Sequence, residues 1–266
     1  MSTASATAAR RSPLLATYAA IVFAFIYLPI AVLVVYSLNR DGVGGFPPRH
    51  FTLDWYRKLF RDSAIWDSVR NSLIVAAGAV ALSLTLGLLA ALAFDRADFP
   101  GKTLFRRLVL LPLILPGIIT GLSLLLFAVR IRLELSLITI FLGHGSALIS
   151  VATTELFAGL QKMDRRQEEA SLDLGATPWR TFWLITFPNL KLSLIAAALL
   201  IFTLSMDEIA VTFFLYGREY TLPLEIWGRL RRGITPEINA ISTLILAASV
   251  VLIVVWYHLR TRSERP

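Results

Sequence analysis

The apolar residues of this chain fall into long blocks, which shorter polar and basic segments separate. About 18 or more consecutive apolar residues are enough for a helix that crosses a bilayer. We therefore expect an all-α membrane protein with six transmembrane helices. These helices are expected at residues 14–38, 69–94, 104–129, 134–159, 188–215 and 239–259.

The composition of the chain agrees with this pattern. Of the 266 residues, 56% are hydrophobic and 17% are charged, whereas a soluble domain carries about 25% charged residues. The formal net charge of +8 does not indicate a nucleic-acid partner, because the basic residues gather at the ends of the apolar blocks, as membrane topology requires. The absence of cysteine excludes disulfides and thiolate metal sites.

The basic residues also predict the orientation in the membrane. An even number of spans puts both termini on one side, and short segments near helix ends weigh most. The loop at 95–103 carries Arg96 and Lys102, and both tails are basic, which favours cytoplasmic termini. The expected organisation is a cytoplasmic tail at 1–13, a membrane domain at 14–259 and a second cytoplasmic tail at 260–266.

Two long segments then lie outside, at about 39–68 and 216–238. Each mixes aromatic and charged residues at roughly helical spacing. Such a segment can form a helix that lies at the level of the lipid headgroups, or it can provide a docking surface or gate at the outer mouth. The sequence leaves both interpretations open.

The long loop at 161–189 predicts two short helices that meet at a corner. Asp164 followed by Gln167 is typical of an N-cap with a reciprocal partner three positions later. The helix that follows is expected to end at Gly175, because a left-handed residue at this position stops helices.

The second helix of this loop is expected directly after the corner. Thr177 is a typical N-cap, and Pro178 occupies the first helical position, where a missing N–H costs nothing. One aromatic face is expected from Trp179, Phe182 and Trp183. Pro188 is expected to break or restart the helix at the entry to the fifth span.

This loop resembles a motif of the permeases of ABC importers, which reads E-A-A, three residues, Gly, nine residues and I-x-L-P. At these spacings the chain has Glu169-Ala170-Ser171, Gly175 and Ile185-Thr186-Phe187-Pro188. The departures, Ser171 for Ala and Phe187 for Leu, do not disturb the corner. The resemblance implies a type I ABC importer permease fold with a cytoplasmic two-helix coupling loop.

In that family, the first helix and the corner lie in a groove of the ATPase subunit and transmit its closure. The resemblance assigns this coupling role to Glu168, Glu169, Ala170, Asp173 and Gly175. ATP and Mg²⁺ then belong to a separate ATPase chain. Gly101-Lys102-Thr103 is not the end of a P-loop, because Arg96 stands where the motif needs its first glycine. We expect no cofactor, metal or catalytic residue on this chain.

Asp207 and Glu208 stand inside an apolar run from about 192 to 215. An acid at the bilayer centre costs about 2.5–3.5 kcal/mol, and no Lys or Arg lies deep in another expected span to pair with them. They are expected either to attract a cationic solute in a water-filled cavity or to form structural hydrogen bonds with a neighbouring helix or subunit. On a helix they would point about 100° apart.

A second resemblance bears on the solute. Phe202–Glu208, Leu222-Pro223-Leu224 and Pro236–Ala240 are similar to the second permease subunit of spermidine/putrescine importers. This resemblance implies a polyamine path that includes Ser205, Asp207, Glu208 and Trp55. The spermidine permease has an acid where this chain has Gly117. That difference weakens the case for spermidine and leaves putrescine-like amines, opines or related solutes open.

Three further residues have two interpretations each. His144, beside two glycines, is either a hydrogen-bond partner between helices or a solute or proton site. Pro112 and Pro116 mark either the hinge of a gate or a kink required by packing.

These features predict a permease subunit that imports a small cationic solute, such as a polyamine, across the bacterial inner membrane by alternating access. Its expected partners are a similar but distinct permease, two ATPase subunits, a periplasmic solute-binding protein and the lipid bilayer. An opine or amino-acid-like solute is one alternative. Another is an ion-coupled secondary transporter, although the paired broken helices of such folds are not evident. A membrane-embedded enzyme has no support from metal or nucleophile spacing.

Overall fold

The computed structural model describes residues 13–40, 50–233 and 235–263. The chain divides into two compact units, one formed by Met1–Asp62 with Arg229–Pro266 and the other by Ser63–Gly228. Helices form nearly all of the secondary structure in the described ranges, which confirms the expected all-α fold. The tail expected at 1–13 lies outside these ranges apart from Pro13. Of the tail expected at 260–266, only the helical backbone to Ser263 is described.

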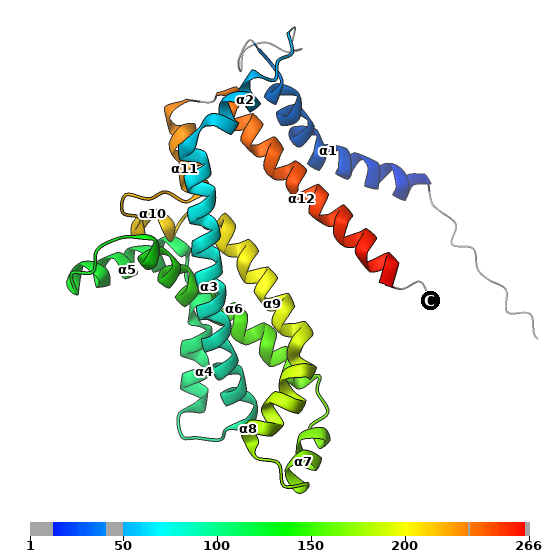
Figure 1. Cartoon of the computed structure of the whole chain (residues 1–266), viewed down its shortest axis with the longest axis vertical. Helices are drawn as coiled ribbons and strands as arrows, with labels where there is room; N and C mark the ends of the chain where they lie inside the picture. Colours follow the sequence, from blue (N-terminus) through cyan, green and yellow to red (C-terminus); the bar gives the residue numbers. More distant parts are fainter. Residues whose placement is uncertain (1–12, 41–49, 234, 264–266) are drawn as a thin grey trace, which may run out of the picture. The chain divides into compact units, whose positions relative to one another are not determined.

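The first unit contains α1 (Pro13–Ser37), α2 (Asp54–Arg61) and α12 (Pro236–Ser263). Both α1 and α2 pack against α12 (Figure 1). The apolar side chains of α1 are exposed within this chain, with Leu14 at 83% and Phe25 at 81%. An apolar helix exposed in this way suits contact with lipid tails.

The second unit is built on three long helices, α3 (Ser63–Arg96), α6 (Leu137–Gln161) and α9 (Phe187–Asp207), which pack against one another (Figure 1). Small residues line the face that α3 turns to α6. Gly87 lies against the backbone and side chain of Ala152, and the Ser83 hydroxyl donates to the carbonyl oxygen of Gly145 at 2.9 Å. Small side chains let membrane helices approach closely enough for such bonds.

Four of the expected spans are present as helices long and apolar enough to cross a membrane, judged on the described residues. They are Leu14–Ser37, Ser63–Arg96, Leu137–Gln161 and Pro178–Asp207. The sixth expected span corresponds to α12, whose described apolar part is Pro236–Val251. The described part of each expected outer segment contains one complete helix, α2 in the first and α11 (Leu222–Arg232) in the second.

The third expected span, at 104–129, is not one continuous helix, so this prediction is wrong. The segment forms α4 (Lys102–Leu110), a short 3₁₀ turn η1 (Leu111–Leu113) and α5 (Gly117–Arg130). The two arms meet at an angle of 107°. Pro116 has extended backbone angles at the start of α5, and a proline also disfavours helical geometry in the residue before it. The proline therefore ends one helix and begins the next.

The fifth expected span also differs at both of its ends. Its helix stops at Asp207 instead of continuing to Leu215, and a separate short helix, α10, covers Thr212–Leu215. At the other end, α8 (Pro178–Thr181) continues through a π-helical turn, η2 (Phe182–Thr186), into α9. Of the two outcomes expected at Pro188, a break or a restart of the helix, the break is absent and α9 begins at Phe187. Pro188 lies in the first turn of α9, where its missing N–H is tolerated, and the π turn widens the helix just before it.

Candidate functional site

The corner between α7 (Arg166–Asp173) and α8 has the local geometry that the sequence predicts. Gly175 adopts a φ of +84° with open space around it, so its left-handed backbone, and not crowding, is what requires glycine. The Thr177 hydroxyl accepts the N–H of Arg180 at 3.4 Å. At the first helix, the Asp164 carboxylate accepts the N–H of Arg166 at 3.0 Å.

One half of the expected cap is wrong. The side chain of Gln167 does not return to the start of α7. Its carbonyl oxygen instead accepts the Asn189 amide at 3.0 Å, and that amide also donates to Ile185. The glutamine therefore links α7 to the first turn of α9.

Four of the five expected coupling residues are exposed. They are Glu169, Ala170, Asp173 and Gly175. The corner also carries an exposed apolar side chain, Leu174, which is 89% exposed. This exposed leucine stands between the carboxylate of Asp173 and the left-handed Gly175.

Glu168, the fifth expected coupling residue, differs because it is only 8% exposed. Its Oε1 accepts the guanidinium of Arg96, at the end of α3, at 2.6 Å. The same oxygen accepts the hydroxyl of Thr186, in the π turn before α9. Glu168 therefore bonds the first helix of the corner to two long helices of its own chain.

Asp95 extends this network to α6. Its carboxylate is 3% exposed and lies 2.9 Å from the guanidinium of Arg165. It accepts the side-chain amide of Gln161, the last residue of α6, at 2.6 Å. The network ties the ends of α3 and α6 to the start of α7. The sequence analysis missed this network, because Arg96 and Glu168 lie 72 residues apart along the chain and share no local motif.

The acidic pair lies where α9 ends, so its two side chains do not share a helix as expected. Glu208 has an extended ψ of 114°, and its Oε1 accepts the N–H of Val211 at 2.8 Å. This bond occupies one carboxylate oxygen of a partly buried residue. Asp207 is exposed, and among the described residues its carboxylate has no hydrogen bond or ion pair. The two acids therefore differ: the carboxylate of Asp207 is exposed, whereas that of Glu208 stabilises the turn.

The other segments beside this turn come from α5 and α6. A Cβ on Gly121 of α5 would lie 3.0 Å from the Cα of Val211, so a larger residue here would crowd the backbone of this turn. A Cβ on Gly117 would lie 3.6 Å from Oε1 of Glu208 and 3.2 Å from the Cβ of Ala210. Gly117, the position at which the resemblance implies an acid in spermidine permeases, is therefore next to Glu208.

Ser205 and His144 meet beside the same turn. Ser205 is 4% exposed, and its hydroxyl lies 2.8 Å from Nδ1 of His144. The imidazole is 1% exposed. Of the two interpretations of His144, the structure supports the hydrogen bond between helices. The solute-path role expected for Ser205 stays a prediction, and its hydroxyl has a structural partner.

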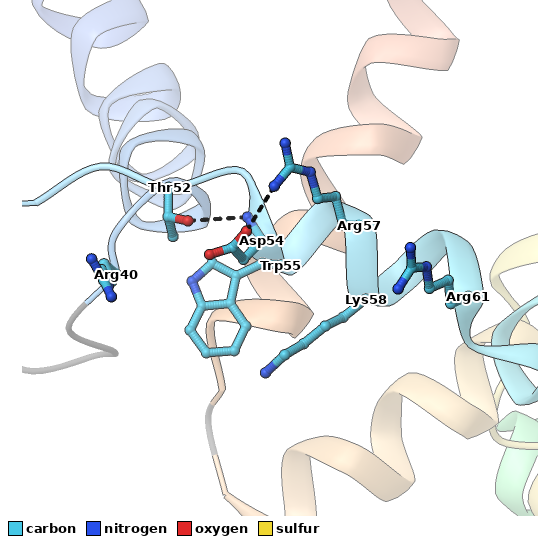
Figure 2. A pocket seen from close by; sticks show the side chains of 7 residues that line it. All are labelled: Arg40, Thr52, Asp54, Trp55, Arg57, Lys58 and Arg61. Atoms are coloured by element: carbon cyan, nitrogen blue, oxygen red, sulfur yellow. Dashed lines mark hydrogen bonds and ion pairs between the residues drawn. The ribbon is translucent and has the colours of Figure 1, made fainter.

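Trp55 belongs to the first unit and lines an open pocket of about 430 Å³ (Figure 2). The ammonium of Lys58 lies 4.5 Å from the centre of its ring and 3.9 Å from the carboxylate of Glu237. The indole N–H donates to the carbonyl oxygen of Asn39 at 2.8 Å. Further pocket residues are Arg40, Thr52, Asp54, Arg57 and Arg61. The face of this tryptophan is thus already covered by a cation of the chain, among mostly basic neighbours.

Comparison with known families gives a direct match. Residues 83–265 match the model of the family described as the binding-protein-dependent transport system inner membrane component. The chain belongs to this family. It is therefore an inner-membrane permease, and the match covers both the α7–α8 corner and the acidic turn.

Among individual relatives, the permease is 37% identical to the putrescine transport system permease protein PotI of Escherichia coli K12. The match covers 91% of this chain and 89% of that protein. It is 31% identical to the spermidine/putrescine transport system permease protein PotC of Haemophilus influenzae, over 88% of this chain and 91% of that protein. These matches agree with the resemblance to polyamine permeases that the sequence indicates.

Solved structures support the fold of the permease. A chain of a bacterial ABC transporter involved in the import of the acidic polysaccharide alginate superposes with a TM-score of 0.69 at 16% identity, over 93% of this chain and 94% of that chain. A chain of the MetNI methionine ABC transporter gives 0.58 at 17% identity, over 81% and 100%. At these identities the likeness shows the fold alone, and it confirms the expected ABC permease architecture.

Proposed function

We propose that this permease is one of two distinct membrane subunits of an ATP-driven importer for a small diamine such as putrescine. The observation that carries the proposal is the carboxylate of Asp207, which is exposed and unpaired among the described residues at the end of a membrane-spanning helix. A lone carboxylate at such a position is costly unless water or a cation compensates it. The substrate named for the PotI relative is a dication of suitable charge.

Energy comes from a separate ATPase, which holds ATP and Mg²⁺, while the permease itself performs no bond chemistry. The exposed residues of the α7–α8 corner, Glu169, Ala170, Asp173 and Gly175, face that ATPase. Glu168 lies on the buried side of α7, and its bonds to Arg96 and Thr186 transmit a movement of α7 to α3 and α9. In this arrangement both termini and the corner are cytoplasmic.

The remaining partners follow from the same arrangement. A periplasmic solute-binding protein delivers the solute at the opposite side of the membrane, and two ATPase subunits serve the permease pair. The membrane path includes Asp207, Glu208 and Ser205, and we keep Trp55 as a candidate contact nearer the outer side. Lys58 must then leave the ring of Trp55 before a solute ammonium takes its place.

The test uses the complete transporter in liposomes and measures uptake of labelled putrescine with and without ATP. Asp207→Asn is expected to raise the half-saturating solute concentration about tenfold, the equivalent of about 1.4 kcal/mol. Glu208→Gln is the matched variant, because its amide oxygen can still accept the N–H of Val211, and it should have a smaller effect. Unchanged uptake by Asp207→Asn contradicts the cationic path, and uptake without ATP favours an ion-coupled transporter instead.

A further inference from the structure

His144 of α6 bonds to both sides of the break in the fifth span. Its Nδ1 lies 2.8 Å from the hydroxyl of Ser205, in the last turn of α9. Its Nε2 lies 2.8 Å from the hydroxyl of Thr212, the first residue of α10. The two acids lie between these hydroxyl residues in the chain. One buried imidazole therefore holds the two ends of the segment that carries them.

The hydrogen bonds around this imidazole have one consistent direction. The Thr212 hydroxyl donates to the carbonyl oxygen of Glu208 at 2.9 Å, so its oxygen must accept the proton of Nε2–H. Nδ1 is then the acceptor, and the Ser205 hydroxyl donates to it. This assignment of the tautomer from the network gives every one of these groups a partner with a single neutral imidazole.

The chain of donors ends on a backbone carbonyl. A carbonyl oxygen of this kind does not carry a transferable proton, so the arrangement does not form a proton path to the carboxylate of Glu208. What it does is fix geometry. A helix break inside a membrane leaves backbone groups that the protein must satisfy, and here Thr212 satisfies the carbonyl of Glu208 while the Glu208 carboxylate accepts the N–H of Val211.

We propose that His144 is a positioning residue, which holds the Ser205–Thr212 turn so that the Asp207 carboxylate stays exposed. The role in solute binding rests on the proposed function, whereas the role in positioning does not. Both can be tested separately, because the chain contains no cysteine and a single one can be introduced.

The positioning test uses Asp207→Cys in the full transporter and measures its rate of labelling by a cationic thiol reagent. Adding His144→Leu removes both hydrogen bonds at similar side-chain volume and should slow labelling at least about fivefold, since each buried hydrogen bond contributes to holding the turn. His144→Gln, whose amide can still donate to Thr212, should slow it less. The control is Ser83→Ala, which removes another bond between helices, to Gly145 beside His144, and should leave the rate unchanged.

Labelling that stays within about twofold of the parent, or becomes faster, in His144→Leu overturns the proposal. Slower labelling in Ser83→Ala does so too, because any loosening of α6 would then suffice.

For solute binding, His144→Leu and Asp207→Asn should combine less than additively in the half-saturating concentration, since both act on one carboxylate. Additive effects overturn the proposed link between His144 and solute binding. If the parent transporter takes up no putrescine, the proposed function is refuted, but the labelling result still tests the positioning role.

Discussion

The guanidinium of Arg96 lies 2.6 Å from the carboxylate of Glu168, and this contact joins the end of α3 to the first helix of the α7–α8 corner. The same carboxylate accepts the hydroxyl of Thr186. A force applied to the exposed face of α7 therefore reaches α3 and α9 through one buried side chain. Because the three long helices pack on one another, the contact links the corner to the body of the second unit.

Removing the charge of Glu168 should uncouple transport from ATP hydrolysis. Glu168→Gln keeps the size of the side chain and an acceptor for Thr186, but it loses the charged bond to Arg96. We expect the solute transported per ATP hydrolysed to fall about tenfold, as for the loss of one charge-assisted hydrogen bond. Simultaneous assays of ATPase activity and uptake in liposomes measure this ratio.

The control for this variant is Asp98→Asn, which breaks the nearby exposed ion pair with Lys102 at 3.1 Å. Exposed pairs contribute about 0–1 kcal/mol, so coupling should be unchanged. An unaltered ratio in Glu168→Gln would show that the contact does not carry the movement.

Gly175→Val should damage coupling through the backbone. A left-handed conformation costs a residue with a Cβ roughly 1–2 kcal/mol, and the valine would move the corner away from a φ of +84°. We expect normal membrane insertion with a loss of transport of about tenfold. Gly228→Val is the matched control, because Gly228 also has open space but no left-handed φ. Equal losses in both variants would assign the effect to side-chain bulk.

Gly117→Asp should shift the preference of the permease toward longer polyamines. The new carboxylate would lie near Oε1 of Glu208, 3.6 Å from the added Cβ, and would offer a further negative charge to a triamine. We expect the ratio of spermidine to putrescine uptake to rise about fivefold, equivalent to ~1 kcal/mol of added attraction. Competition uptake measures the ratio. Gly117→Asn has the same shape without the charge, and a similar shift in that variant would contradict the electrostatic explanation.

Lys58→Met should strengthen solute binding if Trp55 lies on the path. The Lys58 ammonium covers the ring of Trp55 at 4.5 Å, and an exposed cation–π contact contributes about 0.5–1 kcal/mol. Removing it should lower the half-saturating putrescine concentration about twofold to fivefold. Lys58→Arg keeps a cation over the ring and should behave like the parent. No change in Lys58→Met would count against Trp55 as a solute contact.

The features that follow from local chemistry were predictable from the sequence. The apolar blocks determine a helical membrane protein, because a chain in lipid must satisfy its backbone hydrogen bonds internally. The corner after α7 was also predictable, since Gly175 and the pair Thr177-Pro178 act on the backbone within a few residues of themselves. The resemblance of this loop to ABC permeases rests on the same local residues.

Only the tertiary structure decided how the site is built. The end of α9 at Asp207, the inward direction of Glu168 and the position of His144 all depend on partners far along the chain. Arg96 and Glu168 are 72 residues apart in sequence, and His144 and Ser205 are 61 apart. Local preferences cannot reveal such pairs, because a buried polar side chain is stabilised only by the particular donor or acceptor that folding brings within reach.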